Sequence, residues 1–362
     1  MIKITPHEPD SLLIEGPSST VDLDFDVIYT ILSFLLNRTC TRRMESFCAF
    51  MVAQAPLRYP FLQFHISWNA DPVFWAKDPL YEMVKQMKSP LVEAHLNSAT
   101  SEDLEVYYST FQSELHFPRM RKLSAYEWDY PPPGLIAQIF PNLIDLTVSN
   151  DYRGDDLSTA DDQYRQQSLS VQLAGGGWTS LDQLAGRPAD LYKLGLTCQI
   201  RRVKIFYVTS RSRGMVAHIL SDCRPSHVHI LLNQIFSCVL CLPDEVAVRL
   251  TYLRCTIDLA HFSGDSSALD TFRLLLQRSP LTHFMLRFMA NRSRITEGVR
   301  LVREFRSEAF ASQIIASHPS IRYIVIKISY AKPLFWKVLT TESGEVVVDK
   351  APKEDISVVM DL

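Results

Sequence analysis

A six-residue pattern of apolar and polar positions recurs along most of this chain. Apolar side chains stand at its first, fourth and sixth positions, and the pattern often begins two residues after a proline. The alternation over its last three positions is typical of a half-buried β-strand. In chain order the copies are Leu91, Ala94 and Leu96; Met120, Leu123 and Ala125; Leu143, Leu146 and Val148; Leu191, Leu194 and Leu196; His227, Ile230 and Leu232; Leu250, Leu253 and Cys255; Leu281, Phe284 and Leu286; and Ile321, Ile324 and Ile326.

The spacing of these copies predicts a repeat architecture. Successive first positions lie between 23 and 48 residues apart, and two of the intervals are 23 residues long. Leucine-rich repeats occupy about 20–29 residues each. The longest interval, from Leu143 to Leu191, is close to twice that length, and the sequence leaves open whether it contains a further, degenerate unit.

The stretches between several copies have helical periodicity. Ser212–Cys223, Ser266–Ser279 and Ile295–His318 each repeat apolar residues at intervals of three and four. Thr100–Leu115 begins with a threonine cap and acidic residues, which are typical of a helix N-terminus. Alternating strands and helices predict an α/β fold with a parallel sheet. Because one such unit cannot bury its apolar face alone, we expect a solenoid of stacked units.

Three segments depart from this alternation. Asn150–Ser168 is polar and acidic, which predicts a solvated loop, and Ala174–Trp178 contains three consecutive glycines, which predict a turn. Near the C-terminus, Phe335–Asp349 is predicted to form a β-hairpin that turns at Ser343-Gly344 and caps the array.

The N-terminal part of the chain has a different organisation. Residues 1–22 are rich in proline and serine and are predicted to be a tail. Leu23–Leu36 and Arg42–Gln54 have the periodicity of amphipathic helices, and Phe61–Trp68 is predicted to be a short strand. The first helix is either an ordinary core helix or one that docks on a partner, and its periodicity alone leaves both possibilities open.

Composition narrows the class of protein. Of 362 residues, 47% are hydrophobic and 21% are charged, and the formal net charge is −3. These values predict a globular protein and argue against nucleic-acid binding, which requires a basic excess. No apolar run reaches the length of a membrane span, and the acidic, proline-containing N-terminus does not resemble a secretory signal. We therefore expect no membrane association and a cytoplasmic or nuclear location.

The seven cysteines are odd in number and scattered, as expected of free thiols in a reducing compartment. The strongest metal candidate combines Cys223, His227, His229, Cys238 and Cys241. However, the two histidines alternate on a predicted strand, and the last two cysteines lie in an apolar run. We therefore predict core cysteines and a surface histidine pair, with no metal site.

Motifs for catalysis were not found. The sequence has no nucleophile elbow, phosphate-binding glycine loop or zinc-protease motif. The aspartates between Asp151 and Asp162 lack the residue order of a calcium-binding EF-hand loop. These observations favour a protein that is not an enzyme and has no cofactor.

The N-terminal segments Leu23–Leu35 and Glu45–Trp68 resemble the F-box of fungal F-box/leucine-rich-repeat proteins. Two departures from the family pattern are visible: Asp24 or Phe25 stands where proline is usual, and the link Asn37–Arg43 is polar and basic. The positions that carry the resemblance are Leu23, Asp26, Val27, Ile28, Ile31, Leu35, Cys48 and the closing strand Pro60–Ile66.

This resemblance implies a substrate-recruiting subunit of an SCF-type ubiquitin ligase. The N-terminal helices would bind the Skp-type adaptor and thereby the cullin complex, and the repeats would bind a target protein whose identity the sequence does not give. An alternative is a repeat-based protein-interaction scaffold in which a decayed F-box serves only as an N-terminal cap. The resemblance assigns adaptor binding to Leu23, Val27, Ile28, Ile31, Leu35 and Cys48.

The resulting domain prediction has four parts. A flexible tail at 1–22 precedes an F-box-like helical domain at 23–68. An irregular leucine-rich-repeat array follows at 69–330, and a hairpin cap and tail occupy 331–362.

Overall fold

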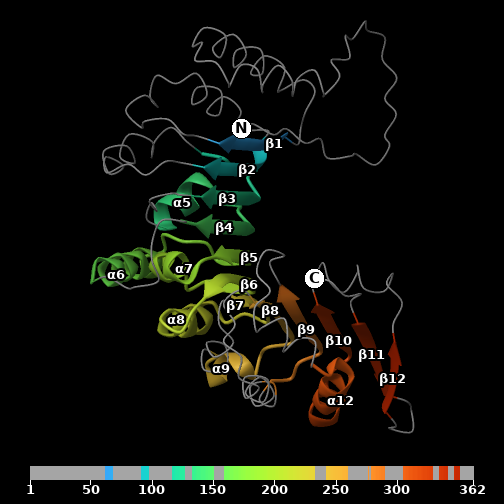
Figure 1. The fold of residues 1–362 in the computed structure, drawn as a ribbon. Helices are drawn as coiled ribbons and strands as arrows, with labels where there is room; N and C mark the ends of the chain where they lie inside the picture. The colour runs from blue at the N-terminus through green and yellow to red at the C-terminus, as the bar shows by residue number, and fades with distance from the viewer. Residues whose placement is uncertain are drawn as a thin grey trace, which may run out of the picture. The chain divides into compact units, whose positions relative to one another are not determined.

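The computed structural model describes residues 62–67, 91–97, 116–126, 133–150, 159–232, 242–259, 276, 279–289, 305–328, 334–340 and 346–350. These residues form a mixed α/β fold in which most strands run parallel, so the predicted α/β class with a parallel sheet is confirmed (Figure 1). The helices of the predicted F-box-like domain lie outside the described residues. The chain divides into two compact units. Unit 1 consists of Met1–Tyr152 and Ser170–Thr179, and unit 2 consists of Arg153–Leu169 and Ser180–Leu362.

Unit 1 contains parallel strands that are paired in chain order. They are β1 (Leu62–Ser67), β2 (Leu91–Asn97), β3 (Lys122–Tyr126) and β4 (Asp145–Ser149), with helix α5 (Pro133–Ile139) between β3 and β4 in the chain. The register pairs Leu123 with Leu146 and Ala125 with Val148, and all four side chains are buried. The fourth and sixth positions of consecutive copies therefore stack on each other, as the pattern predicts.

Unit 1 also contains a glycine turn and a buried tryptophan that contacts Phe140. Gly175 has a φ of +87°, a left-handed conformation that favours glycine, so the predicted turn at Ala174–Trp178 is confirmed. The buried indole of Trp178 donates a hydrogen bond from Nε1 to the carbonyl oxygen of Phe140 at 2.9 Å. The ring of Phe140 stacks on Phe117 at a centroid distance of 5.4 Å.

We expect Trp178→Phe to lower the free energy of unfolding by about 1–3 kcal/mol, because it leaves the buried Phe140 carbonyl without its donor. Urea denaturation followed by circular dichroism would measure the change. Trp336→Phe is the matched control, since the buried Trp336 indole makes no hydrogen bond to a described residue. An equal loss in both variants would show that ring volume, rather than the hydrogen bond, accounts for the effect.

Unit 2 continues the alternation of helices and parallel strands and ends in an antiparallel hairpin. Helix α6 leads into it, although the last turn of α6, Ser170–Leu173, belongs to unit 1. Its elements are α6 (Thr159–Leu173), β5 (Ser180–Gly186), α7 (Pro188–Leu194), β6 (Gln199–Val208), α8 (Arg213–Cys223), β7 (His227–Leu232), α9 (Asp244–Ala247), β8 (Tyr252–Asp258), β9 (His283–Met289), α12 (Ser307–Ser317), β10 (Tyr323–Ile328), β11 (Leu334–Thr340) and β12 (Val346–Lys350).

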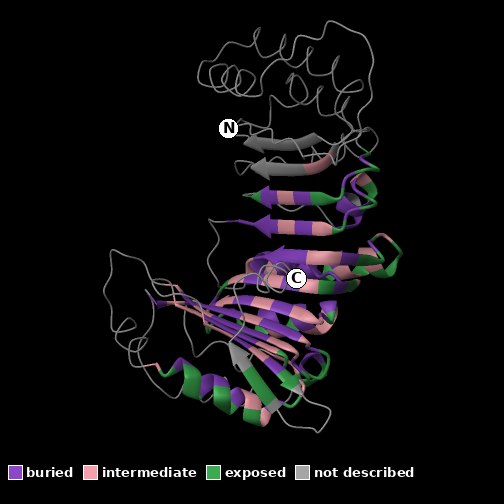
Figure 2. Ribbon diagram, turned by 90° about the vertical axis from the view of Figure 1, so that its right-hand side faces the viewer, coloured by how far each residue is buried: buried purple, intermediate pink, exposed green. Residues whose placement is uncertain are grey.

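The core of unit 2 consists of two rows of apolar side chains that run across the parallel strands. Figure 2 shows buried residues along these strands, and in β7 buried and half-buried residues alternate. Because neighbouring strands pair in register, each buried residue lies beside the corresponding residue of the next strand. One row contains Leu184, Val203, Val228, Leu253, Phe284 and Ile324, and the other contains Ile205, Ile230, Cys255, Leu286 and Ile326; all are 3% exposed or less.

The strand predicted at Leu191–Leu196 is wrong, because this segment forms helix α7. Apolar residues three positions apart fit a helix face as well as a strand start. Pro188 in the first turn and Gly195, whose φ is +53° at the C-cap, are typical helix boundaries. The pattern instead occurs in β6, as Ile200, Val203 and Ile205, and in part in β5, where Gly186 follows Leu181 and Leu184 at the sixth position. The prediction missed both strands. The interval between Leu143 and Leu191 therefore contains a further strand, β5.

The frame predicted for β7 is shifted by two residues. The pattern predicts His227 at the first core position, but Pro225, Val228 and Ile230 are the buried residues at the first, fourth and sixth positions. His227 is half-buried on the opposite face of the strand. The prediction of a strand here is correct, and its error arises because Ile230 and Leu232 are also two residues apart.

The loop predicted at Asn150–Ser168 is also wrong in its second half, where α6 begins at Thr159. Asp161 and Asp162 lie in its first turn, where carboxylates interact favourably with the helix dipole. The side chains of Arg165 and Ser168 are buried. Polar side chains that pair with neighbouring helices therefore replace the apolar stripe on which the prediction relied.

The helices predicted at Ser212–Cys223 and over the second half of Ile295–His318 are confirmed as α8 and α12. The predicted hairpin is confirmed as the antiparallel pair β11–β12, whose turn at Ser343-Gly344 lies outside the described residues. β1 confirms the predicted strand within Phe61–Trp68 and pairs with β2. None of the helices in the described ranges has the length and apolarity needed to cross a membrane.

Candidate ligand-binding face

The side chains between the core positions of β6–β10 form the second face of the sheet in unit 2, because successive residues of a strand point to opposite faces. We call this the outward face. Most of its residues are half-buried, and the others are buried. It comprises Arg202 and Lys204 on β6, His227, His229 and Leu231 on β7, Tyr252, Arg254 and Thr256 on β8, His283, Met285 and Arg287 on β9, and Tyr323, Val325 and Lys327 on β10.

A ladder of four aromatic rings crosses the outward face. His227, Tyr252, His283 and Tyr323 occupy the same register position on β7, β8, β9 and β10. The centroid distances between successive rings are 5.5, 5.9 and 5.0 Å, with interplanar angles of 18°, 30° and 18°. Strands about 4.8 Å apart bring side chains at one register position into contact. The inner rings of this ring ladder therefore have neighbours on both faces and present their edges.

Hydroxyl groups orient the two histidines of the ring ladder. Thr282 donates its hydroxyl to the carbonyl oxygen of Thr251 at 3.0 Å and lies 2.8 Å from Nδ1 of His283. Because that hydroxyl proton is already used, Nδ1 of His283 donates to Thr282 and Nε2 is left as an acceptor. Ser226 lies 2.8 Å from Nδ1 of His227 in the same way. Burial lowers the pKa of both imidazoles, so both are neutral at pH 7.

Beside the ring ladder lies a cationic cluster, Lys204, Arg254 and Arg287. Lys204 on β6 and Arg254 on β8 flank His229 on β7, and Arg287 lies one register position further along, beside Thr256. None of the three cations makes an ion pair or a side-chain hydrogen bond in the part of the chain that the structure describes. The Nε atoms of Arg254 and Arg287 are both buried without a partner.

Electrostatics within the cationic cluster are unfavourable. Burial lowers the pKa of Lys204, and the nearby guanidinium of Arg254 lowers it further. The pKa of Arg254 is likewise lowered by burial, with a contribution from Arg287. The charges of Lys204 and Arg254 are thus held in poorly solvated places beside like charges, an arrangement that costs free energy until an anion neutralises it.

His229 lies within the cationic cluster, and its pKa is lowered by burial and by the charges of the cluster. Burial, followed by the charges of Arg254, Lys204 and Arg287, lowers its pKa to about 3. Its Nε2 lies 3.2 Å from the hydroxyl oxygen of Thr256. His229 is therefore a neutral hydrogen-bonding group at pH 7, and the positive charge of the face comes from the lysine and arginines.

Asp182 on β5 forms ion pairs with two arginines of β6 at the edge of the outward face. It accepts a hydrogen bond from Nε of Arg201 at 2.6 Å and also pairs with Arg202. These arginines lower the pKa of Asp182. Arg202 is therefore already neutralised, whereas Lys204, Arg254 and Arg287 remain available to a ligand.

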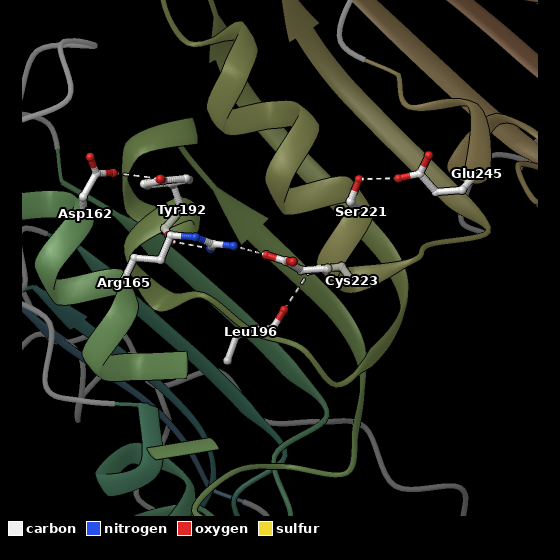
Figure 3. Close-up of polar contacts among 8 residues, drawn as sticks. Asp162, Arg165, Tyr192, Leu196, Ser221, Cys223 and Glu245 are labelled. Atoms are coloured by element: carbon white, nitrogen blue, oxygen red, sulfur yellow. Dashed lines mark hydrogen bonds and ion pairs between the residues drawn. The ribbon is translucent and has the colours of Figure 1, made fainter. Parts of the chain in front are cut away.

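The helices of unit 2 carry a second polar cluster, but its groups are paired with one another. Figure 3 shows Arg165 on α6 beside Tyr192 on α7, to whose carbonyl oxygen it donates at 3.0 Å. Arg165 also pairs with Asp222 on α8. Tyr192 donates to Asp162 at 2.8 Å, and Lys193 pairs with Asp161 at 2.8 Å. These contacts join α6, α7 and α8 to one another. The groups of this cluster are used in those contacts, so we infer that the cluster stabilises the fold and does not bind a ligand.

Some of the predicted site residues lie among the described residues, and the others lie outside them. The six residues assigned to adaptor binding, Leu23, Val27, Ile28, Ile31, Leu35 and Cys48, lie outside the described residues. Of the metal candidates, Cys223 is a buried free thiol that donates to the Leu196 carbonyl at 3.7 Å, whereas both histidines lie on the outward face. No group of three metal-ligating side chains occurs in the described ranges, and Cys238 and Cys241 lie outside them.

Sequence reasoning missed the outward face, although it recognised that His227 and His229 share one side of a strand. The sequence does not give the pairing register of β7 to β10, and this register is what brings the rings together. With Pro225, Leu250, Leu281 and Ile321 aligned at the first position, the third position reads His, Tyr, His and Tyr across consecutive strands.

Comparisons with known proteins add no assignment: no family model, no curated protein and no solved structure matches the chain.

Proposed function

We propose that this chain is a non-enzymatic binding protein built as an irregular leucine-rich-repeat solenoid, whose outward face recognises a target. The observation that supports this proposal is the in-register stacking of the six-residue pattern. Its fourth and sixth positions form the core across β6–β10, and its third, fifth and seventh positions display rings and cations on the opposite face. Repeats of this kind supply an extended binding surface.

We further propose that the protein recruits its target to an SCF-type ubiquitin ligase. The support is the resemblance of Leu23–Leu35 and Glu45–Trp68 to an F-box, followed in the chain by the repeats, in the order that the resembling family has them. An amphipathic helix with Val27, Ile28 and Ile31 on one stripe has the anchor spacing of a helix that docks in an apolar groove. The partners would be a Skp-type adaptor and, through it, a cullin.

The second candidate is a repeat-based scaffold without a ligase role. In it, the N-terminal helices act only as a cap on the array. The residues that stand where the family usually has proline, Asp24 or Phe25, favour this alternative.

A pull-down of the full chain with a purified Skp-type adaptor separates the two candidates. We expect the parent chain to bind and the Ile28→Asp/Ile31→Asp variant to lose binding, because two carboxylates cannot enter an apolar groove without a large desolvation cost. Unchanged circular dichroism would show that the variant still folds. Absence of binding by the folded parent would contradict the ligase proposal and favour the scaffold.

A further inference from the structure

We infer that the outward face binds an extended, carboxylate-rich peptide segment of the target protein, with Arg254 and Arg287 as its main anchors. This inference deepens the proposed target-binding role and depends on it. It rests on three features of unit 2, which are the unpaired cations, the length of the row, and the way in which the rings are stacked.

The first feature is a pair of arginines without an anionic partner among the described residues. Arg254 and Arg287 carry guanidinium groups, which only donate hydrogen bonds, and both have a buried Nε without a hydrogen-bond partner in the described ranges. A buried donor without an acceptor costs free energy in the free protein. It binds strongly to an anion that reaches the outward face, because hydrogen bonds between ionised partners are stronger than those between neutral groups. The Nε of Arg202 on the same face is also buried without a hydrogen bond to a described residue, but the charge of Arg202 is paired with Asp182. On this face, the guanidinium groups without an ion pair to a described residue are therefore those on β8 and β9.

The second feature is length. The outward face runs across five parallel strands, β6 to β10, which at about 4.8 Å per strand spacing corresponds to about 19 Å. Its cations are spread along this row, with Lys204 on β6, Arg254 on β8, Arg287 on β9 and Lys327 on β10. A single small anion reaches one or two of them. About six residues of extended peptide span the whole row.

The third feature argues for a peptide and against a single-stranded nucleic acid. Proteins that bind single strands without sequence preference stack bases on open aromatic faces. Here Tyr252 and His283 each have a ring on both sides at 5.0–5.9 Å, which leaves no room for a base between them. What the ring ladder presents is a row of polar edges, including the acceptor Nε2 of His283. Such edges suit the backbone N–H groups of a peptide.

The test measures binding of the full chain to a fluorescein-labelled peptide of six Glu-Gly repeats by fluorescence anisotropy. We expect binding that weakens as salt rises, and affinity at least about 30-fold lower for the corresponding Gln-Gly peptide. Arg254→Met/Arg287→Met is expected to weaken Glu-Gly binding by at least about 30-fold, because two charge-assisted hydrogen bonds are lost. The thermal midpoint of this variant should be unchanged or higher, since methionine removes two unpaired charges.

The matched control is Arg249→Met/Arg306→Met, which removes the same charge from exposed positions away from the outward face. We expect it to retain binding within about twofold. The inference is overturned if Arg254→Met/Arg287→Met binds as the parent does, if neither peptide binds, or if a labelled twelve-nucleotide oligouridine binds more tightly than the Glu-Gly peptide. No adaptor is present in this assay, so its outcome is separate from that of the pull-down.

Discussion

Arg165→Met is expected to lower the free energy of unfolding by about 2–4 kcal/mol, although the substitution preserves most of the aliphatic volume. Arg165 is 7% exposed at its side chain and pairs with Asp222, which is 24% exposed. Removing one partner of a buried pair leaves the other charge poorly solvated, and this uncompensated charge accounts for most of the cost. The partial exposure of Asp222 keeps the expected value below that of a fully buried pair.

Two further contacts are lost with Arg165. Its Nη1 donates to the carbonyl oxygen of Tyr192, and its guanidinium lies 4.6 Å from the centroid of the Tyr192 ring (Figure 3). One side chain therefore connects α6, α7 and α8. Urea denaturation would measure the change, and Arg165→Met/Asp222→Leu should recover part of it because no unpaired charge remains. A double variant less stable than Arg165→Met would contradict the charge-based explanation.

The same residue explains why α6 could not be predicted. Helix prediction depends on an apolar stripe, and Thr159–Leu173 instead contains several polar and charged residues. The helix is stabilised by partners that are far away in the sequence. Asp162 accepts from Tyr192, Asp161 pairs with Lys193, and Arg165 pairs with Asp222. None of these pairings is visible in a local window.

Strands with core residues at every second position were predictable, because apolar residues that recur two positions apart leave a local signal. β3, β4, β8, β9 and β10 follow the predicted core positions, for example Leu253 and Cys255 on β8. The Leu191–Leu196 segment failed because three-residue spacing fits both a helix and a strand. The candidate site failed for a different reason: a ladder of four rings exists only once the strand register is known.

His229 leads to the second large prediction, a loss of stability in acid. Its pKa is about 3 in the folded protein, whereas an unperturbed histidine, as in the unfolded chain, has a pKa of 6.5. Between these values the unfolded chain binds a proton that the folded chain does not, so stability falls as the pH falls. The contribution is complete well above pH 6.5 and is lost by up to about 1.4 kcal/mol per pH unit as the pH falls from 6.5 towards 3. From pH 6.5 to 4.5 the loss is about 2 kcal/mol.

His229→Gln removes the titrating group and retains a side chain that can bond to Thr256. We therefore expect the stability of this variant to fall by about 2 kcal/mol less than that of the parent between pH 6.5 and 4.5. Urea denaturation at both pH values measures the difference, and acid groups common to both chains cancel in the comparison. His227→Gln is the control, since burial lowers the pKa of His227 by less. Equal acid sensitivity in His229→Gln and the parent would contradict the prediction.

The acid response and the proposed ligand are linked through the same charges. Lys204, Arg254 and Arg287 face His229 from β6, β8 and β9, and they hold its pKa down together with burial. A bound carboxylate would offset these charges and raise the pKa of His229, so binding should take up protons. The Glu-Gly peptide should therefore bind the parent more tightly at pH 5 than at pH 7, and His229→Gln should lack this increase. A pH response that persists in His229→Gln would place the proton uptake on another group and contradict this link.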